Sequence, residues 1–367
     1  MIDQLRNSRL VEIFGWMPLR IGVSLVIPVI TFFVLHWSFL FMRAAAAPRA
    51  MIAIVALVVG VGGVWALYLA MNHVVFQLPI KARDSLLPYV FVGPALVVLM
   101  IYIIIPSVRT ISLSFMDRRG EEFVGLANYV FALTDPGMII TLRNTGLWLV
   151  LVPAVAVTFG LLIAVIADRM SEFWERVAKS FIFMPMAISF VGASIIWRFI
   201  YFYQPPDFDQ IGLLNAIWTH FGNDPVGWLT LRPWNNLFLI WIMIWMQTGF
   251  AMVILSAAVK GVPSTLLDAA RIDGAGEVRV FFNVIIPYVS GTILTVTTTI
   301  LILVLKIFDV VFVMTSGQYQ TGVVAFRMYQ EAFIFRHFGR GSALATVLFL
   351  AVLPIMIRNM KEMRARR

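Results

Sequence analysis

Residues 237–259 read LFLIWIMIWMQTGFAMVILSAAV, a run of 23 residues that contains no charged side chain. An α-helix rises about 1.5 Å per residue, so about 20 apolar residues cross the hydrocarbon core of a bilayer. Lipid offers no hydrogen bonds to an exposed backbone, whereas a helix satisfies its amides within the segment. The run therefore predicts a transmembrane helix.

Apolar runs of similar length recur along the chain. With the first run included, they lie at 21–42, 51–71, 88–106, 145–167, 180–201, 237–259, 289–314 and 343–360. The sequence is 61% hydrophobic and 13% charged, whereas soluble domains carry about 25% charged residues. The runs do not show the period-two alternation of barrel strands. These features predict an all-α integral membrane protein with about eight transmembrane helices.

Composition also excludes several kinds of site. The sequence contains no cysteine, and its four histidines lack the spacing of metal ligands. A thiol nucleophile, a disulfide framework and a metal site are therefore not expected. The net charge of +9 comes largely from Lys and Arg in inner loops and at the C-terminus, which membrane orientation explains without nucleic acid.

Charge also predicts the orientation of the chain. Residues 358–367 carry five basic side chains, which favours a cytoplasmic C-terminus with a basic tail at 361–367. An even number of spans then places the N-terminus on the same side. The first run, 21–42, is longer than the apolar core of a signal peptide, about 7–15 residues, and is expected to be retained.

The inner loop at 260–287 has a helical pattern of its own. Ser264 or Thr265 is a suitable N-cap residue for a short amphipathic helix, which Gly274 would end. A second amphipathic piece follows at 277–282. On residue pattern alone, two interpretations are equally favoured: a helix resting on the lipid surface and an element that docks onto a cytoplasmic partner.

The sequence DAARIDGA at 268–275, followed by Ile-Ile-Pro at 285–287, resembles the EAA loop of binding-protein-dependent ABC importer permeases. The resemblance extends over about residues 88–360 and is to sugar permeases of the maltose/α-glucoside type. The leading Glu of the family pattern is Asp268 here. The residues that the resemblance assigns to coupling with the ATPase are Asp268, Ala269, Ala270, Arg271, Asp273, Gly274, Ala275 and Pro287.

The resemblance implies an architecture and a set of partners. A six-helix type I ABC importer permease core occupies 88–360, with its coupling loop at 261–287, after a region at 1–87 that holds two extra transmembrane helices. The implied protein is a transport subunit of the bacterial inner membrane and not an enzyme. Its partners are a second homologous permease, a dimer of ATP-binding subunits and an extracytoplasmic sugar-binding protein. The sequence lacks a phosphate-binding loop, so ATP and Mg are expected in the partner ATPase and no cofactor in this chain.

Polar groups inside the apolar runs suggest a solute path, because such groups are costly in lipid and commonly face a cavity or a partner. Trp245, Gln247, Thr248 and Phe250 cluster in the sixth run, at the stretch where maltose-type permeases bind sugar. Ordinary helix-packing side chains are the equally favoured alternative. The same resemblance adds Val304 and Ile307 in the seventh run, where the family has several polar contacts.

Lys306 and Asp309 are three residues apart and would share one face of a continuous seventh helix. An internal ion pair that neutralises both is the favoured interpretation, and a gate contact with a partner helix is the alternative. Asp309 is also the one carboxylate expected inside a span. An ion-coupled secondary transporter, which would need a buried carboxylate relay, is therefore a weak rival. A permease for a polyol or glycerol phosphate is the stronger rival.

Overall fold

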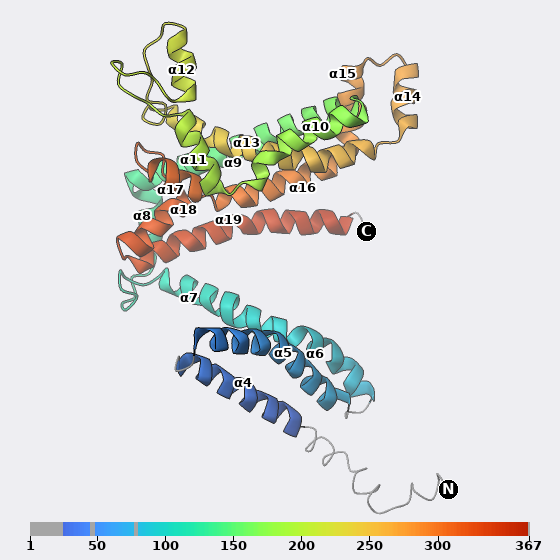
Figure 1. Ribbon diagram of the computed structural model, residues 1–367, viewed down its shortest axis with the longest axis vertical. Helices are drawn as coiled ribbons and strands as arrows, with labels where there is room; N and C mark the ends of the chain where they lie inside the picture. Colours follow the sequence, from blue (N-terminus) through green and yellow to red (C-terminus); the bar gives the residue numbers. More distant parts are fainter. Residues whose placement is uncertain (1–24, 45–47, 77–79, 366–367) are drawn as a thin grey trace, which may run out of the picture. The chain divides into compact units, whose positions relative to one another are not determined.

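The computed structural model describes residues 25–44, 48–76 and 80–365, which form helices and connecting segments (Figure 1). In these ranges no β-strand forms, and the one isolated bridge joins Met116 and Phe123. The chain divides into two compact units, residues 1–107 and 108–367. This boundary lies later than the predicted start of the core at 88.

In its described residues the first unit contains the helices α4 (Val26–Ala44), α5 (Arg49–Phe76) and α6 (Ile80–Leu99). α6 continues through a π-helical turn, η1 (Met100–Ile104), into α7 (Ile105–Leu113). α4 and α5 approach closely at Gly63, where an added Cβ would lie 2.7 Å from a methyl carbon of Leu35. The predicted N-terminal tail and the beginning of the run at 21–42 lie outside the described residues.

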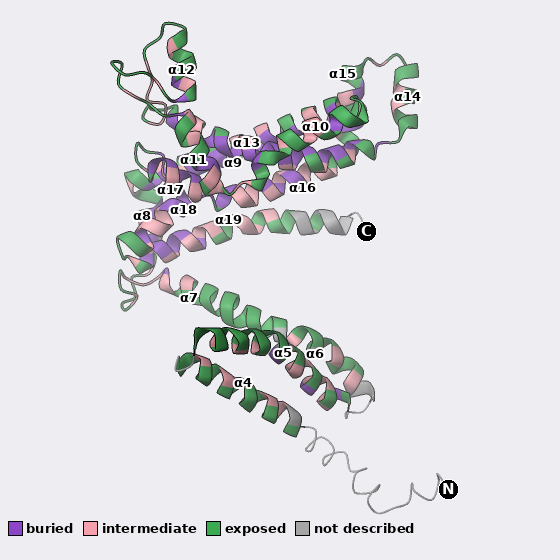
Figure 2. Cartoon of the chain, in the orientation of Figure 1, coloured by how far each residue is buried: buried purple, intermediate pink, exposed green. Residues whose placement is uncertain are grey.

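The second unit is built around a long parallel pair, α9 (Pro136–Asp168) and α13 (Asn235–Lys260). The two helices touch closely where Gly160 faces Ala251, and Trp148 of α9 donates a hydrogen bond to Asn236 Oδ1 of α13 at 3.1 Å. α16 (Ile286–Leu305) packs along the same pair. Buried residues concentrate on these three helices (Figure 2).

The predicted run at 180–201 is not one straight helix. α10 (Glu172–Phe183) leads through a 3-10 turn, η2 (Met184–Ala187), to α11 (Phe190–Ile200), and the two halves meet at 103°. Pro185 lies within the turn, and Ser189 Oγ caps α11 by accepting a hydrogen bond from the Gly192 amide at 3.1 Å. A proline and a new N-cap therefore divide an apolar segment that hydropathy alone treats as continuous.

The predicted run at 289–314 is also interrupted. The helix begins earlier, at Glu277 (α15, Glu277–Val280), passes through a π-helical turn, η3 (Phe281–Ile285), and ends with α16 at Leu305. A separate short helix, α17 (Asp309–Thr315), follows. The prediction of one span over these residues is therefore wrong at its C-terminal end.

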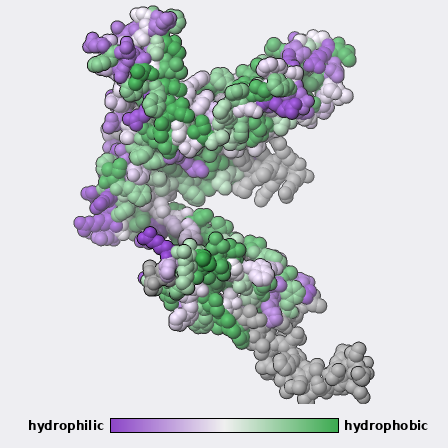
Figure 3. Space-filling model, viewed as in Figure 1, coloured by the Kyte–Doolittle hydropathy of each residue, from purple (hydrophilic) through white to green (hydrophobic). Residues whose placement is uncertain are grey.

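Six described helices are long and apolar enough to cross a membrane, and the bent α10–α11 pair supplies a seventh span if it is counted as one. Together with the shorter apolar helix Pro28–Ala44, they account for each predicted run. In the second unit, hydrophilic side chains gather over α12 (Leu213–His220) and over α14 (Ser264–Ile272) with α15, and hydrophobic side chains lie between (Figure 3). This pattern fits helices that run through a bilayer.

One end of the second unit is held together by the segment from α17 to the start of α19 (Phe338–Ala365), which includes α18 (Val324–Tyr329) and η4 (Gln330–Ile334). Arg118 donates a hydrogen bond to the Phe335 carbonyl at 2.7 Å, and Arg327 pairs with the buried Glu331 at 2.8 Å. The Arg340 amide donates to His337 Nδ1 at 3.2 Å. Burial, and then the nearby Arg340 charge, lower the pKa of His337 below its usual value.

Acidification is expected to weaken the segment from α17 to the start of α19 through His337. Because the pKa of His337 is lower in the folded state, the unfolded chain binds more protons just below about pH 6.5, and stability falls as pH decreases through that window. Thermal unfolding of the purified protein at pH 7.5 and 5.5 measures the effect. His337→Gln should lose less stability than the wild type on acidification, whereas His220→Gln on α12, an exposed position, should behave as wild type. An equal pH response of all three proteins would contradict the assignment.

Candidate coupling loop and solute path

The loop that joins α13 to α16 folds as a short helix, a turn and a second helical piece. α14 spans Ser264–Ile272, and its N-cap residue is Pro263. Ser264 and Thr265 are thus the first residues of the helix, so the prediction that one of them is the N-cap is wrong. The loop lies at the same end of the second unit as the C-terminal end of α19, and α12 lies at the opposite end (Figure 1).

The end of α14 explains the glycine at position 274. Gly274 has φ +80°, the left-handed conformation that glycine adopts without strain. The Gly274 amide donates to the Arg271 carbonyl and the Ala275 amide donates to the Ala270 carbonyl, each at 3.0 Å. These two bonds form a Schellman motif with Gly274 at the C′ position. The motif fixes the direction in which the chain leaves α14.

The loop exposes large apolar side chains beside its charges. Ile272 is 86% exposed and Val278 is 72% exposed, and Leu266 and Phe282 are also exposed. Exposed apolar residues that lie together with charges are typical of a surface that meets a partner or lipid. Pro287 is the second residue of α16 and directly follows the π-helical turn η3, within the helix that runs from Glu277 to Leu305.

Charged residues tie the two halves of the loop together. Arg271 pairs with Asp268 at 3.2 Å and with Glu277 at 3.0 Å. The Glu277 carboxylate, and to a smaller extent that of Asp268, raise the pKa of Arg271 above its usual value. The Asp268 carboxylate, which stands where the family pattern has Glu, remains 63% exposed while it pairs with Arg271.

The predicted cluster in α13 divides between a cavity and the core. A cavity of about 310 Å³ has eight lining residues: Phe159, Phe181, Ile182, Pro185, Trp241, Ile244, Trp245 and Thr248. Trp245 and Thr248 therefore lie on the cavity wall; Trp245 also packs against the core, as does Phe250, which does not line this cavity. Gln247 is buried, and within the described part of the chain its Oε1 has no hydrogen-bond partner.

Sequence reasoning missed the rest of the cavity wall. Trp241 stands one helical turn before Trp245, and Ile182 and Pro185 come from the bend between α10 and α11. The position of Trp241 four residues from Trp245 was a usable signal. The contribution of the bend depends on tertiary packing, and no local pattern marks it.

Val304 and Ile307 do not line a path in this structure. They are 0% and 3% exposed and belong to the core formed by α9, α13 and α16. Their apolar side chains are packed inside the subunit, which corrects the expectation that they face the solute.

Lys306 and Asp309 do not share a helical face. Lys306 is the residue after the last turn of α16, and Asp309 is the first residue of α17. Among the ion pairs of the described residues, none joins these two side chains. The helix break separates them, so the predicted internal pair is not formed.

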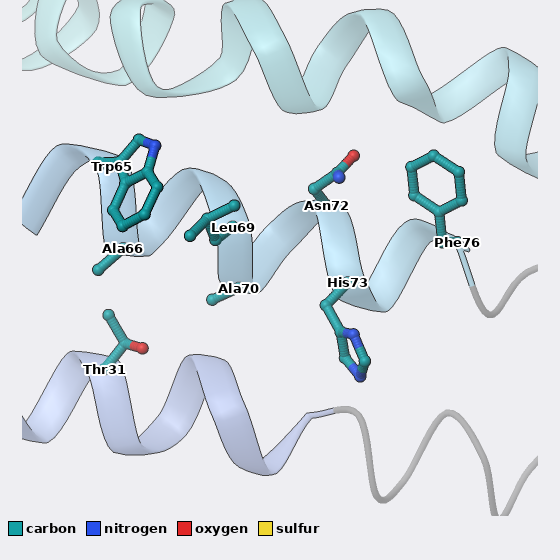
Figure 4. A pocket seen from close by; sticks show the side chains of 8 residues that line it. All are labelled: Thr31, Trp65, Ala66, Leu69, Ala70, Asn72, His73 and Phe76. Carbon is teal, nitrogen blue, oxygen red and sulfur yellow. The ribbon is translucent and has the colours of Figure 1, made fainter.

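A second cavity, of about 680 Å³, lies in the first unit along α5, with Thr31 contributed by α4 (Figure 4). Thr31 of α4 faces Ala66 of α5 across it, and Asn72 and His73 stand near the end of α5. No sequence motif pointed to this cavity, because its lining residues are almost all ordinary side chains of apolar helices.

A family model described as binding-protein-dependent transport system inner membrane component matches residues 156–367. The chain belongs to this family. The matched part of the permease contains the whole loop at 261–287, the broken α10–α11 pair and α13. Membership confirms the predicted class, a multi-pass membrane subunit of an ABC importer that is not itself an enzyme.

Relatives of the permease carry names that concern sugars and related solutes. The osmoprotective compounds uptake permease protein GgtC of Synechocystis sp. is 54% identical over 275 residues, which cover 75% of this chain and 98% of that protein. The alpha-glucoside transport system permease protein AglF of Rhizobium meliloti is 48% identical over 286 residues, which cover 77% and 84%.

The permease also shares its fold with a solved bacterial ABC transporter that is involved in the import of the acidic polysaccharide alginate. The TM-score is 0.67 at 18% identity, with 78% of this chain and 97% of that chain covered. At this identity the likeness concerns the fold alone, and it confirms the all-α type I permease architecture. A related solved structure includes a periplasmic protein bound to an alginate pentasaccharide.

Proposed function

We propose that this chain is one of two permease subunits of an ABC importer for an α-glucoside-type sugar. Residues 261–287 couple it to a dimer of ATP-binding subunits, which hold the ATP and Mg, and an extracytoplasmic binding protein delivers the sugar. Both termini lie in the cytoplasm. The location of α14–α15 and the C-terminal end of α19 at one end of the second unit supports this orientation, since that end carries the basic C-terminal segment.

The coupling loop is the single observation that carries the proposal. α14 ends in a Schellman motif at Gly274, exposes Ile272 and presents paired charges. Apolar anchors supply affinity at an interface, while charges set register and suppress wrong partners. A short helix with a fixed exit can therefore transmit the movement of a partner to α13 and α16.

The cavity beside α13 supports a sugar as the solute. Trp245 offers an aromatic face and Thr248 a hydroxyl group on the same wall. Small-molecule sites combine mostly apolar and aromatic walls with a few polar groups that fix orientation. The relationship to AglF, whose name specifies alpha-glucosides, supports the α-linked class.

A polyhydroxylated osmoprotectant is the second candidate. The 54% identity to GgtC, whose name specifies osmoprotective compounds, favours it. Both candidates need hydroxyl recognition, so the same cavity serves either one.

Trp245→Ala is expected to raise the apparent KM for solute uptake by about tenfold, because loss of one well-packed aromatic contact weakens binding by roughly 1–2 kcal/mol. The assay is uptake and ATPase stimulation by the reconstituted complex with its binding protein, across a panel of disaccharides and polyols. Trp174→Ala, at a 58% exposed position on α10 outside the cavity, is the matched control. A response to polyols only would overturn the α-glucoside assignment, and an unchanged KM would remove Trp245 from the path.

A further inference from the structure

Two groups of charges lie at the cytoplasmic end of the second unit, one at each end of the coupling loop. The first group surrounds Glu175, near the start of α10. Its buried carboxylate accepts hydrogen bonds from Lys179, on the same helix, and from Lys260, the last residue of α13, at 2.9 Å. Lys179 also donates to Ser256 of α13. This group fixes the start of α10 against the point where the coupling loop begins.

The second group surrounds Glu277, at the point where the loop returns to the membrane. One carboxylate oxygen accepts from Arg271 Nε at 3.0 Å, and the other accepts from Arg169 Nη2. Arg271 belongs to α14, whereas Arg169 is the C-cap residue of α9. A single carboxylate thus connects the coupling helix to a transmembrane helix that is 108 residues away in sequence.

The ion pair between Arg271 and Glu277 also spans the turn between α14 and α15. Gly274 and Gly276 separate α14 from α15, and an added Cβ at either position meets nothing within 4 Å. α15 is only four residues long, so it cannot hold α14 in place by helix continuity. The Schellman motif fixes the exit from α14 at Gly274, but a force applied to α14 would be absorbed by bending at Gly276 unless a cross-link resists it.

Exposed ion pairs contribute little when they are isolated, and more when several charges form a network. Asp268, Arg271, Glu277 and Arg169 form such a chain, with side chains that are about half exposed. Each arginine also has the planar donor geometry that suits a carboxylate. This series of ion pairs is therefore suited to hold α14 in position rather than to stabilise the fold as a whole.

We propose that Glu277 is a positioning residue for energy coupling, which clamps α14 to the connection between α9 and α10. The proposal rests on the coupling function proposed above and deepens it. Movement of α14 reaches α9 through Arg169 as well as passing along the chain to α13 and α16. The connection between α9 and α10 at 169–171, together with Glu175, is then a second receiver of the ATP-driven movement.

Transport per ATP tests the clamp in the complete reconstituted importer. Glu277→Gln and Arg169→Gln should each lower solute molecules transported per ATP hydrolysed by about threefold to fivefold, as expected for a modest charge network. The double variant should be no worse than either single one, because both remove the same link. Arg169→Lys, which keeps the positive charge, should retain most of the wild-type number of solute molecules transported per ATP. Glu172→Gln, which breaks the exposed pair with Arg176 on α10, is the matched control and should leave the ratio unchanged.

A distance measurement separates failure of the clamp from failure of the coupling function. The chain has no cysteine, so spin labels can be attached at Met170→Cys, after α9, and Thr265→Cys, in α14. In the complete importer with Glu277 intact, the distribution of distances between the two labels should stay narrow in the ATP-free and ATP-bound states. Glu277→Gln should broaden that distribution. Suppose that Glu277→Gln leaves both the distance distribution and the number of solute molecules transported per ATP as in the wild type, while Gly274→Glu still abolishes uptake. The proposed role of Glu277 is then wrong, and the coupling function of the loop stands. If Gly274→Glu leaves uptake intact, the coupling function itself fails.

Discussion

Gly274→Glu is expected to abolish binding-protein-dependent solute uptake while expression and membrane insertion remain normal. Gly274 has φ +80°, and a residue with a Cβ pays roughly 1–2 kcal/mol in the left-handed region. The strain would disturb the two hydrogen bonds that end α14. The new carboxylate would also stand in open space beside Asp273, on the surface that we assign to the ATPase.

Three further substitutions separate strain from charge. Gly274→Asn should keep most of the uptake, because asparagine tolerates the left-handed conformation, and Gly274→Ala should fall between the two. Gly276→Glu introduces the same charge two residues later at φ −68°, without the strain. Uptake, ATPase activity and the amount of permease in the membrane are measured together. Unchanged uptake by Gly274→Glu at normal expression would rule out a coupling role for this turn.

The sequence was most informative where local geometry decides the structure. Helix, glycine break and second helix at 264–282 were predicted from the spacing of apolar residues and the position of Gly274. The structure adds the reason, since only a residue that accepts positive φ completes the Schellman motif there. Hydropathy located every long apolar segment, because the cost of exposing backbone to lipid is a property of the segment alone.

The breaks in two spans were not predictable from the same signals. Pro185 lies at the bend between α10 and α11, yet Pro153 and Pro354 lie inside α9 and α19, which continue through them. A proline therefore marks a possible bend, and tertiary packing decides whether one forms. Lys306 follows the last turn of α16, but a single charge at that position also fits a helix whose lysine reaches the interface.

The predicted solute path was partly resolved by helix geometry. Side chains advance about 100° per residue, so Trp245 and Thr248 share a face while Gln247 points about 200° away from Trp245. The structure agrees, with the first two on the cavity wall and Gln247 buried. Val304 and Ile307 were included by resemblance alone, and their apolar character gave no physical support for a path. The link between Arg169 and Glu277 joins distant segments, and no local pattern marks it.

Gly160→Val is expected to destabilise the permease severely by forcing α9 and α13 apart. A Cβ added at Gly160 would lie 2.6 Å from the Ala251 Cβ and 2.8 Å from the Met252 amide nitrogen. Backbone atoms cannot rotate away as a flexible side chain can, so the helices must separate along the contact that forms the core of the second unit. Overpacking of this kind costs about 1–3 kcal/mol, and more where backbone must shift. Small residues at such contacts are what allow membrane helices to pack closely.

Gly146 lies on the same helix and supplies a matched control, because a Cβ there meets nothing within 4 Å. Gly146→Val should therefore leave the unfolding temperature and the yield of monodisperse protein close to wild type. Gly160→Ala, which adds one methyl group, keeps the comparison possible if the valine variant does not accumulate, and it should still unfold at a lower temperature than Gly146→Ala. Equal stability of the two alanine variants would mean that α9 and α13 can separate at little cost. The tight α9–α13 contact would then not be what stabilises the second unit, and the burial of Trp148 and its hydrogen bond to Asn236 would have to supply that stability instead.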